Sequence, residues 1–272
     1  MAPLPTRFWQ DLPWPAFRNL PANTVAVLPV ASIEQHGPHL PVSVDTTINQ
    51  GVVARTLSVL PAEVPVLVLP TQCVGNSVEH LRFPGTLTTT PETLLTLVAD
   101  IGASVARAGV KRLVIVNSHG GNVSVLDIAA RKLRILHGIF VVNAMWARMG
   151  KPESQRDPVE STYGIHAGRD ETSVLLALRP DLVRMEHARN FVSRWQGASN
   201  IAPRVSPAAG APLAWQAQDL NPAGAVGDAS AATAAQGEEI LDFAAGKMAA
   251  LWSEVATFDV EAWLANEPDP NA

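Results

Sequence analysis

Cysteine is almost absent from the sequence, which contains only Cys73, so a framework of disulfides within the chain is excluded. The first residues, MAPLPTRFWQDLPW, lack the basic stretch and the apolar stretch that an export signal combines. Long apolar runs are missing too, because runs such as residues 64–70 fall far short of the ~20 residues that a membrane-spanning helix needs. We therefore expect a cytoplasmic protein that does not span a membrane.

Positive charge is scarce, with 20 lysines and arginines against 25 aspartates and glutamates and a net charge of −5. Basic residues form no local cluster in the sequence, so the positive field that a phosphate backbone requires is missing and nucleic acid is not an expected partner. Charged residues make up only 17% and apolar residues 47%, which is the composition of a folded chain. The 272 residues suit one large domain, 1–272, with residues 189–224 as a candidate loop insertion.

An alternation of short apolar runs and helical patterns sets the expected fold. Four runs rich in β-branched and aliphatic residues predict buried strands, at residues 24–30, 64–69, 112–116 and 138–143. Segments with helical spacing lie between and after them, at residues 46–60, 91–108, 123–136, 172–178 and 229–257. This order predicts an α/β fold, a single three-layer domain in which helices flank a mainly parallel sheet.

Polar segments follow three of the predicted strands, at residues 32–39, 72–80 and 118–122. In open α/β sheets, ligands bind in the crevice at the C-terminal ends of the strands, so we expect these segments to converge on one site. The polar stretch 146–170 contains glycine and proline and is a candidate lid over that crevice. Trp146, at its start, is a candidate wall of a substrate pocket, with core packing as the alternative.

The string SIEQHGPHLPVSVDT places Glu34, His36 and Asp45 directly after the first predicted strand. In an extended segment, residues two apart project to the same side, so the Glu34 carboxylate and the His36 imidazole can face one volume. The loop that follows is long enough to return Asp45 to that volume. Mixed imidazole and carboxylate ligands suit Zn²⁺, Mn²⁺ or Fe²⁺. The alternative from spacing alone is an ordinary polar loop, in which Glu34 caps backbone groups and His36 is exposed.

Two further motifs fall where predicted strands end or helices begin. NSHGGN puts His119 at the end of the third strand, on a turn that Gly120 and Gly121 allow to approach a ligand closely. GIHAGRDETS puts His166 and Glu171 at the start of a short helix. Each motif alone fits a structural role, as a glycine turn or as a carboxylate that the helix dipole favours. All three motifs place histidines or carboxylates at predicted strand ends or helix starts, which favours one shared site.

Two other histidines, His39 and His80, lie in segments next to the expected crevice. They are candidates for orienting a metal ligand or binding substrate, and a satisfied or exposed histidine is the alternative for each. No serine lies in the pattern of a nucleophile elbow, so a serine hydrolase is not expected.

These strings resemble the creatininase family of metal-dependent amidohydrolases. The matching strings are LPVASIEQHGPHLPVSVDT, NSHGGN, GIHAGRDETS and GDASAATAAQGEEI, which extend from about residue 28 to about residue 240. The resemblance implies a single α/β domain with a two-metal site, hydrolysis of a C–N bond, and a homo-oligomer that is often a hexamer.

The resemblance also implies roles for single residues. By motif, the metal ligands would be Glu34, His36, Asp45 and His119, with Asp45 as the bridge. Glu171 would be a further ligand or the catalytic carboxylate, and His166 would carry protons. Family members that hydrolyse creatinine have a tyrosine and a glutamate directly after the metal-binding histidine, whereas Gly120 and Gly121 follow His119 here. Glu171 could supply the missing carboxylate, and creatinine itself is not the expected substrate.

We therefore expect a binuclear metal-dependent amidohydrolase that holds two divalent cations, Zn or Mn, with Fe as a further option. It would cleave the C–N bond of a cyclic amide, a formamide or a small peptide-like substrate with a water activated between the ions. Two alternatives use the same residues differently. A mononuclear isomerase or lyase needs one cation, and a non-catalytic ligand-binding protein needs no turnover.

Overall fold

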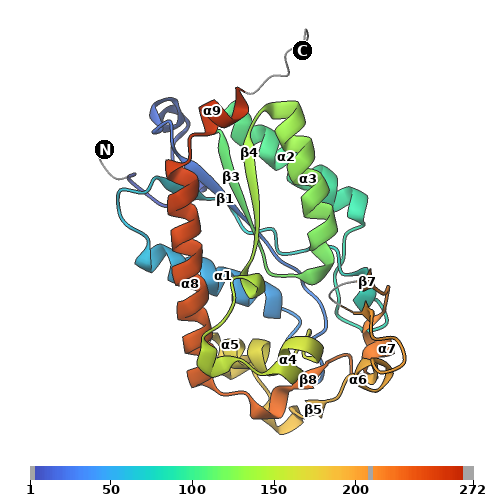
Figure 1. The fold of residues 1–272 in the computed structure, drawn as a ribbon. Coiled ribbons are helices and arrows are strands. Elements are labelled where there is room, and N and C mark those ends of the chain that lie inside the picture. Colours follow the sequence, from blue (N-terminus) through green and yellow to red (C-terminus); the bar gives the residue numbers. More distant parts are fainter. Residues whose placement is uncertain (1–3, 208–210, 266–272) are drawn as a thin grey trace.

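A four-stranded parallel sheet forms the centre of the molecule (Figure 1), for which the computed structural model describes residues 4–207 and 211–265. Its strands are β1 (Val25–Val30), β2 (Val66–Val68), β3 (Arg112–Asn117) and β4 (Phe140–Met145), in the order β2-β1-β3-β4. The four predicted strands are thus confirmed. The register pairs Val30 with Asn117, and Asn117 with Met145, so three strands reach the same edge and the polar segments after β1 and β3 start side by side.

Helices cover both faces of this sheet, which confirms the three-layer α/β domain (Figure 1). The longer helices are α1 (Val44–Val59), α2 (Pro91–Arg107), α3 (Val123–His137), α5 (Arg169–Leu178) and α8 (Ala234–Thr257). On one face, Ile115 of β3 packs in a core with Leu94 of α2 and Leu133 of α3. On the other face, Val27 of β1 shares a core with Trp252 of α8 and with part of α1. Because alternate strand residues point to opposite faces, the continuous apolar runs fill both cores.

Local signals explain where two of the helices begin. Thr90 caps α2, since its side chain accepts a backbone N–H of the first turn at 3.2 Å, and Pro91 takes the first position as predicted. Helix α8 begins at Ala234 rather than at residue 229, because Thr233 and Gln236 form a capping box there.

The starts of α1 and α5 also differ from the prediction, and the difference bears on the site. Helix α1 begins at Val44 rather than at residue 46, so Asp45 lies in its first turn and not in the preceding loop. Helix α5 begins at Arg169 rather than at residue 172, which places Glu171 in a first turn as well. Both carboxylates therefore lie where the helix dipole favours negative charge.

Short elements make up the connections, including the stretches 146–170 and 189–224. The 3-10 helices are η1 (Trp9–Asp11), η2 (Trp14–Asn19), η3 (Val78–His80), η4 (Gly120–Asn122), η5 (Trp146–Arg148), η6 (Glu153–Gln155), η7 (Pro180–Leu182), η8 (Met185–His187) and η9 (Ala229–Ala231). The remaining elements are α4 (Pro158–Tyr163), β5 (Asn190–Phe191), α6 (Arg194–Ala198), β6 (Val205–Ser206), β7 (Ala211–Pro212), α7 (Ala217–Leu220), β8 (Gly227–Asp228) and α9 (Val260–Leu264). Strand β5 pairs antiparallel with β8, and β6 pairs in parallel with β7. Within residues 4–207 and 211–265, none of the helices combines the length and the hydropathy needed to cross a membrane.

Candidate metal centre

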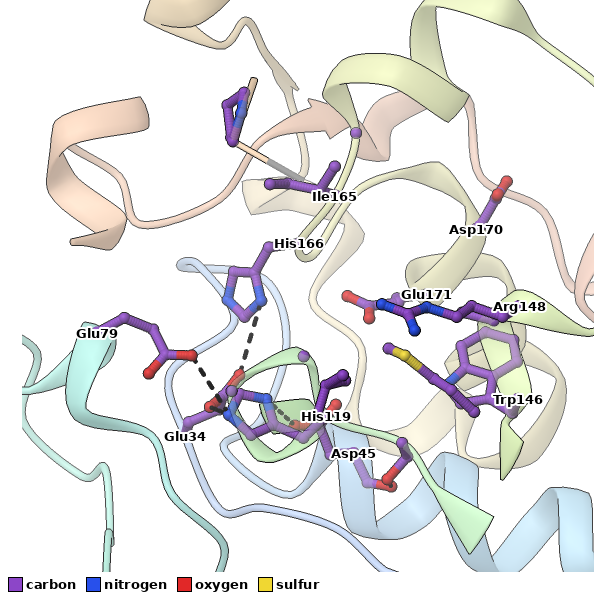
Figure 2. Close-up of a pocket in the computed structure, with 18 of the residues that line it drawn as sticks. Glu34, Asp45, Glu79, His119, Trp146, Arg148, Ile165, His166, Asp170 and Glu171 are labelled. Atoms are coloured by element: carbon purple, nitrogen blue, oxygen red, sulfur yellow. Dashed lines mark hydrogen bonds and ion pairs between the residues drawn. The ribbon is translucent and has the colours of Figure 1, made fainter. Parts of the chain in front are cut away.

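The candidate side chains from the three motifs gather at the C-terminal edge of the sheet (Figure 2). They come from the segments after β1 and β3 and from the starts of α1 and α5, and are Glu34, His36, Asp45, His119, His166 and Glu171. All of them except His36 line a cavity of about 880 Å³. The segments 32–39, 72–80 and 118–122 all contribute to its wall, so the predicted convergence of the three loops is found.

The first group of ligand atoms comes from Glu34, Asp45 and His119. Glu34 Oε2 is 3.2 Å from His119 Nε2, and Asp45 Oδ2 is 3.4 Å from His119 Nδ1. One ligand atom of each residue lies within 4.8 Å of the others. Since bonds from Zn²⁺ to nitrogen and oxygen are ~2.0–2.2 Å long, two ligands of one ion lie roughly 3–4 Å apart. Because one imidazole binds an ion through a single nitrogen, the fit to one cation rests on one ligand atom from each residue, all within 4.8 Å of one another.

A second group uses the other oxygen of Asp45. His36 Nε2 is 3.6 Å from Asp45 Oδ1 and 3.8 Å from Glu171 Oε2, and these three residues also satisfy the spacing of a cation site. The two oxygens of Asp45 thus face different imidazoles, His36 and His119. A carboxylate in this position can bridge two ions.

His166 lies close to both groups. Its Nδ1 is 3.7 Å from Glu34 Oε1 (Figure 2). A ligand atom of His166 also lies within 4.8 Å of ligand atoms of Glu34 and His36. Its Nε2–H donates to the backbone oxygen of Gln35 at 2.8 Å, which assigns the free lone pair to Nδ1. The imidazole therefore presents an acceptor nitrogen to the cluster.

Backbone and hydroxyl groups orient the ligands. His36 Nδ1–H donates to the backbone oxygen of Glu34 at 3.0 Å, so Nε2 is left to face Asp45 and Glu171. The Ser32 hydroxyl donates to Asp45 Oδ2, and the backbone N–H of Ala167 donates to Glu171 Oε2 at 2.6 Å. Such contacts fix the tautomer and the direction of a metal ligand.

Several polar atoms of the cluster are buried without a hydrogen-bond partner. They are both carboxylate oxygens of Glu34 and Nε2 of His36, in side chains with exposed fractions of 1% and 0%. A buried polar atom that makes no hydrogen bond costs roughly 1–3 kcal/mol, so such atoms indicate a missing partner. A divalent cation satisfies a carboxylate oxygen and an imidazole nitrogen together, so the donor atoms fit bound cations.

In the metal-free chain, the buried carboxylates favour the protonated form of the neighbouring imidazoles. Burial lowers the pKa of His36, but the carboxylates of Asp45 and Glu171 outweigh burial and raise it to about 9. The pKa of His119 also lies well above its usual value, because Glu34 and Asp45 outweigh the effect of burial. For Asp45 burial acts in the opposite direction, yet the two imidazoles hold its pKa far below the usual range. Protonated imidazoles thus supply the positive charge that these carboxylates require.

Two of the predicted substrate contacts, His80 and Trp146, lie in the cavity wall. His80 Nε2 is 3.4 Å from Glu34 Oε1, and the side-chain amide of Gln35 donates to His80 Nδ1 at 2.8 Å. His80 is therefore held directly beside the first group of ligands, whereas Trp146 lines the wall with its buried indole.

His39 does not line the cavity, although the sequence predicted a substrate contact. Its Nε2 lies 3.0 Å from Thr172 Oγ1, and its ring stacks on Phe191 at 5.4 Å between centroids. The side chain is buried among α5 and β5, so it packs these elements together instead of facing a ligand.

Other charged residues in the cavity wall were missed by the sequence analysis: Glu79, Arg148, Lys151 and Glu160. Glu79 lies in the predicted crevice segment 72–80, which was the available signal, and its Oε1 is 3.4 Å from His119 Nε2. A Cβ at Gly121 would overlap Glu79 Oε1. The second glycine of NSHGGN is therefore needed for this carboxylate to approach His119.

Comparison with known proteins identifies the family of this chain. The family model for creatininase, described as creatinine amidohydrolase, matches residues 10–252. A mycofactocin precursor peptide peptidase of Mycobacterium tuberculosis (strain CDC 1551 / Oshkosh) is 39% identical over 225 residues, which cover 79% of each chain. A creatinine amidohydrolase of Pseudomonas putida is 34% identical over 198 residues, which cover 66% of this chain and 74% of that protein. A solved structure named creatininase Mn superposes with a TM-score of 0.72 at 26% identity, covering 92% of this chain and 98% of the other. This chain belongs to the creatininase family.

Proposed function

We propose that this hydrolase is binuclear and cleaves an amide C–N bond with two divalent cations. The observation that carries the proposal is the position of Asp45, whose Oδ2 lies 3.4 Å from His119 Nδ1 and whose Oδ1 lies 3.6 Å from His36 Nε2. One carboxylate borders two groups of ligand atoms, of which Glu34 completes the first and Glu171 the second. Buried atoms without hydrogen-bond partners occur in both groups, which supports a cation in each.

The proposed ions are Zn²⁺ or Mn²⁺, with Fe²⁺ as a further option. Each group offers two carboxylates and one imidazole, a set that borderline and hard divalent cations accept. The name of one similar solved structure includes Mn, which supports the same choice. When bound, two such ions lower the pKa of a water towards neutrality and polarise the carbonyl oxygen of an amide.

His166 is the proposed proton carrier. Its Nε2–H is engaged by the backbone oxygen of Gln35, so only Nδ1, which faces Glu34, can exchange a proton. Burial and the neighbouring imidazoles, His36 foremost, hold its pKa well below the usual value, so the ring is neutral and its Nδ1 lone pair is available. Burial raises the pKa of Glu171 to about 7 against the effect of His36, so this carboxylate can also exchange a proton before it binds an ion.

The cavity supports a substrate larger than a single small ring. Its volume of about 880 Å³ lies in the upper part of the range for drug-sized ligands, roughly 300–1,000 Å³. Its wall contains the indoles of Trp146 and Trp215 together with the charged side chains of Arg148 and Lys151. A short peptide or peptide-like amide offers matching apolar and polar groups, and the relative named as a precursor peptide peptidase supports this class.

Metal content and the origin of the oxygen in the product test the proposed reaction together. Elemental analysis of the purified protein is expected to give two divalent cations per chain. Hydrolysis of a short peptide or formamide in ¹⁸O-labelled water is expected to place one label in the new carboxylate. One cation per chain with no label in the product would instead support an isomerase or lyase, and bound ligand without turnover would support a binding protein.

Replacing the bridging carboxylate tests the assignment of ligands. The variant Asp45→Ala is expected to lose both cations and nearly all hydrolysis, because it removes an oxygen from each ligand group. Asp127→Asn on the outer face of α3, where Asp127 pairs with Arg131, is the matched control and should keep both ions. An Asp45→Ala protein with two ions and normal turnover would contradict the proposal.

A further inference from the structure

A buried carboxylate outside the ligand groups, that of Glu160, lies at the centre of the segments that carry His166 and Glu171. Glu160 belongs to the short helix α4, and the residue is only 6% exposed. Its Oε1 accepts the backbone N–H of Arg169 at 2.6 Å, and its Oε2 accepts the backbone N–H of Asp228 at 2.9 Å. Both oxygens therefore use their hydrogen-bonding capacity on backbone from two separate elements, α5 and β8.

Three glycines make room for this carboxylate. A Cβ at Gly164 or at Gly168 would overlap the carboxyl group of Glu160, and a Cβ at Gly227 would approach Glu160 Oε1 to 2.6 Å. Gly227 also has a φ of 117°, a conformation that other residues rarely adopt. The glycines come from both sides of His166 and from β8, so the chain is shaped around this side chain.

The backbone that Glu160 holds is the backbone that aims His166 and Glu171. Arg169 is the first residue of α5, and Glu171 follows it within the same turn. Between them and His166, Ala167 adopts a φ of 56° and donates its N–H to Glu171 Oε2. The backbone oxygen of His166 accepts the N–H of Val226 at 2.9 Å, next to β8.

The segments that contain His166 and Val226 contact each other, and Glu160 accepts a hydrogen bond from each of them, at Arg169 and at Asp228. Helices α4 and α5 and strand β8 lie together at one end of the molecule (Figure 1). Loss of the carboxylate would leave two partly buried N–H groups without this acceptor and would free the strained turn at Ala167 to relax. Among the proposed ligands, Glu171 should be displaced most by this change, because the N–H of Ala167 orients its carboxylate directly.

We propose that Glu160 is a positioning residue that fixes His166 and Glu171, and through Glu171 the cation site formed with His36 and Asp45. The inference rests on the proposed function, since it requires that these side chains bind cations. Glu160 itself belongs to none of the ligand groups found among the described residues. The first site is formed by Glu34, Asp45 and His119, from the segments after β1 and β3 and from the start of α1, and the hydrogen bonds of Glu160 go to Arg169 and Asp228 instead of to these segments.

The test is titration of the metal-free chain with Zn²⁺ by calorimetry, for the native protein and for Glu160→Gln. Glutamine keeps the volume of the side chain but turns an –NH₂ group towards one of the two backbone N–H donors. The affinity of one Zn²⁺ is expected to fall by roughly 10- to 100-fold, as is common when a contact that orients a ligand is lost. The affinity of the other Zn²⁺ should change by less than about twofold.

Two further variants separate positioning from a general loss of stability. Leu133→Ala removes a core side chain between α2 and α3 and should lower the melting temperature while leaving both Zn²⁺ affinities unchanged. Gly168→Ala keeps Glu160 but places a methyl group against its Oε1, and should weaken the same single site as Glu160→Gln. If Glu160→Gln does not fold, Gly168→Ala carries the test.

The outcomes are distinct. Native Zn²⁺ affinities in both site variants, or an equal loss at both sites, would overturn the role of Glu160 and leave the proposed function intact. A native chain that binds no Zn²⁺ would overturn the proposed function and this inference with it. Selective loss of one site in Glu160→Gln and Gly168→Ala, with Leu133→Ala unaffected, is the result expected.

Discussion

At the scale of single residues, the site is a balance of charges. The carboxylates of Asp45 and Glu34 lie among imidazoles whose pKa values they raise, to about 9 for His36 and well above the usual value for His119. A cation that binds an imidazole nitrogen must first displace the proton there. Metal binding and proton release are therefore coupled at this site.

The coupling predicts how metal affinity depends on pH. With a pKa of about 9, His36 is protonated at pH 7 in the metal-free chain and must lose its proton when it binds an ion. The apparent affinity should therefore rise with pH, by about tenfold per unit for each proton displaced, and level off above pH ~9. Calorimetry in two buffers of different ionisation enthalpy counts the released protons. An affinity independent of pH below that value, with no proton release, would contradict the assignment of His36.

Motif spacing was sufficient to locate the candidate ligands and insufficient to find the residues around them. Glu34 and His36 face one volume because alternate residues of an extended segment project to one side, as predicted. Glu79 contacts His119 and Glu160 contacts Asp228, and no local pattern marks contacts between residues so far apart in the chain. His39 lies in the same polar segment as Glu34 and His36, yet its side chain points towards Thr172 and Phe191, against which it packs.

At the scale of elements, turns with glycine determine how closely carboxylates approach the imidazoles. The 3-10 turn η4 contains two neighbouring glycines, of which Gly121 is closely surrounded and Gly120 is open. A Cβ at Gly121 would overlap Glu79 Oε1 and approach His119 Nε2 to 2.5 Å, whereas a Cβ at Gly120 would meet nothing within 4 Å. The turn therefore has one glycine that the site requires and one that it does not.

This contrast gives a prediction with an internal control. Gly121→Ala should displace Glu79 and His119 and weaken the cation site shared by Glu34, Asp45 and His119 by roughly tenfold or more. Gly120→Ala should leave metal affinity and stability close to native. Zinc titration of both variants checks this, and equal behaviour of the two would contradict the close approach seen at Gly121.

Elements were predictable from sequence where local chemistry decides them. The four strands and the start of α2 at Pro91 follow from apolar runs and from a helix cap. The start of α8 was placed too early, because alanine-rich sequence looks helical before the capping box at Thr233. The first turn of α1 was missed because its polar residue Asp45 resembles loop sequence, whereas Glu171 was expected at the start of α5, as found.

At the scale of the whole molecule, the stability of the folded chain should depend on whether the buried polar cluster binds metal ions. Ions that bind only the folded chain stabilise it by about 2.7 kcal/mol at a concentration of ~100 times Kd. In a chain of this size that corresponds to a rise of roughly 5–10 °C in melting temperature. EDTA should therefore lower the melting temperature of the native protein and Zn²⁺ should restore it, as thermal scans can show. Asp45→Ala should not respond to EDTA, and a native chain that does not respond either would contradict the account.

The part of the cavity wall that lies outside the three predicted loops could not be predicted in detail from the sequence. Segments 146–170 and 213–215, far apart in the chain, form it together, and short irregular elements such as η5 and α4 determine where their side chains point. The sequence predicted the first segment as a lid and the second as part of a loop insertion. Which residues would face the ligands depends on contacts between these segments, which no periodic pattern encodes.

The most direct test of the central claim is anomalous diffraction from crystals grown with Zn²⁺, measured at the zinc edge. The account predicts two peaks on either side of the Asp45 carboxylate, one next to Glu34 and His119 and the other next to His36 and Glu171. A single peak, or none within bonding distance of Asp45, would contradict a binuclear centre.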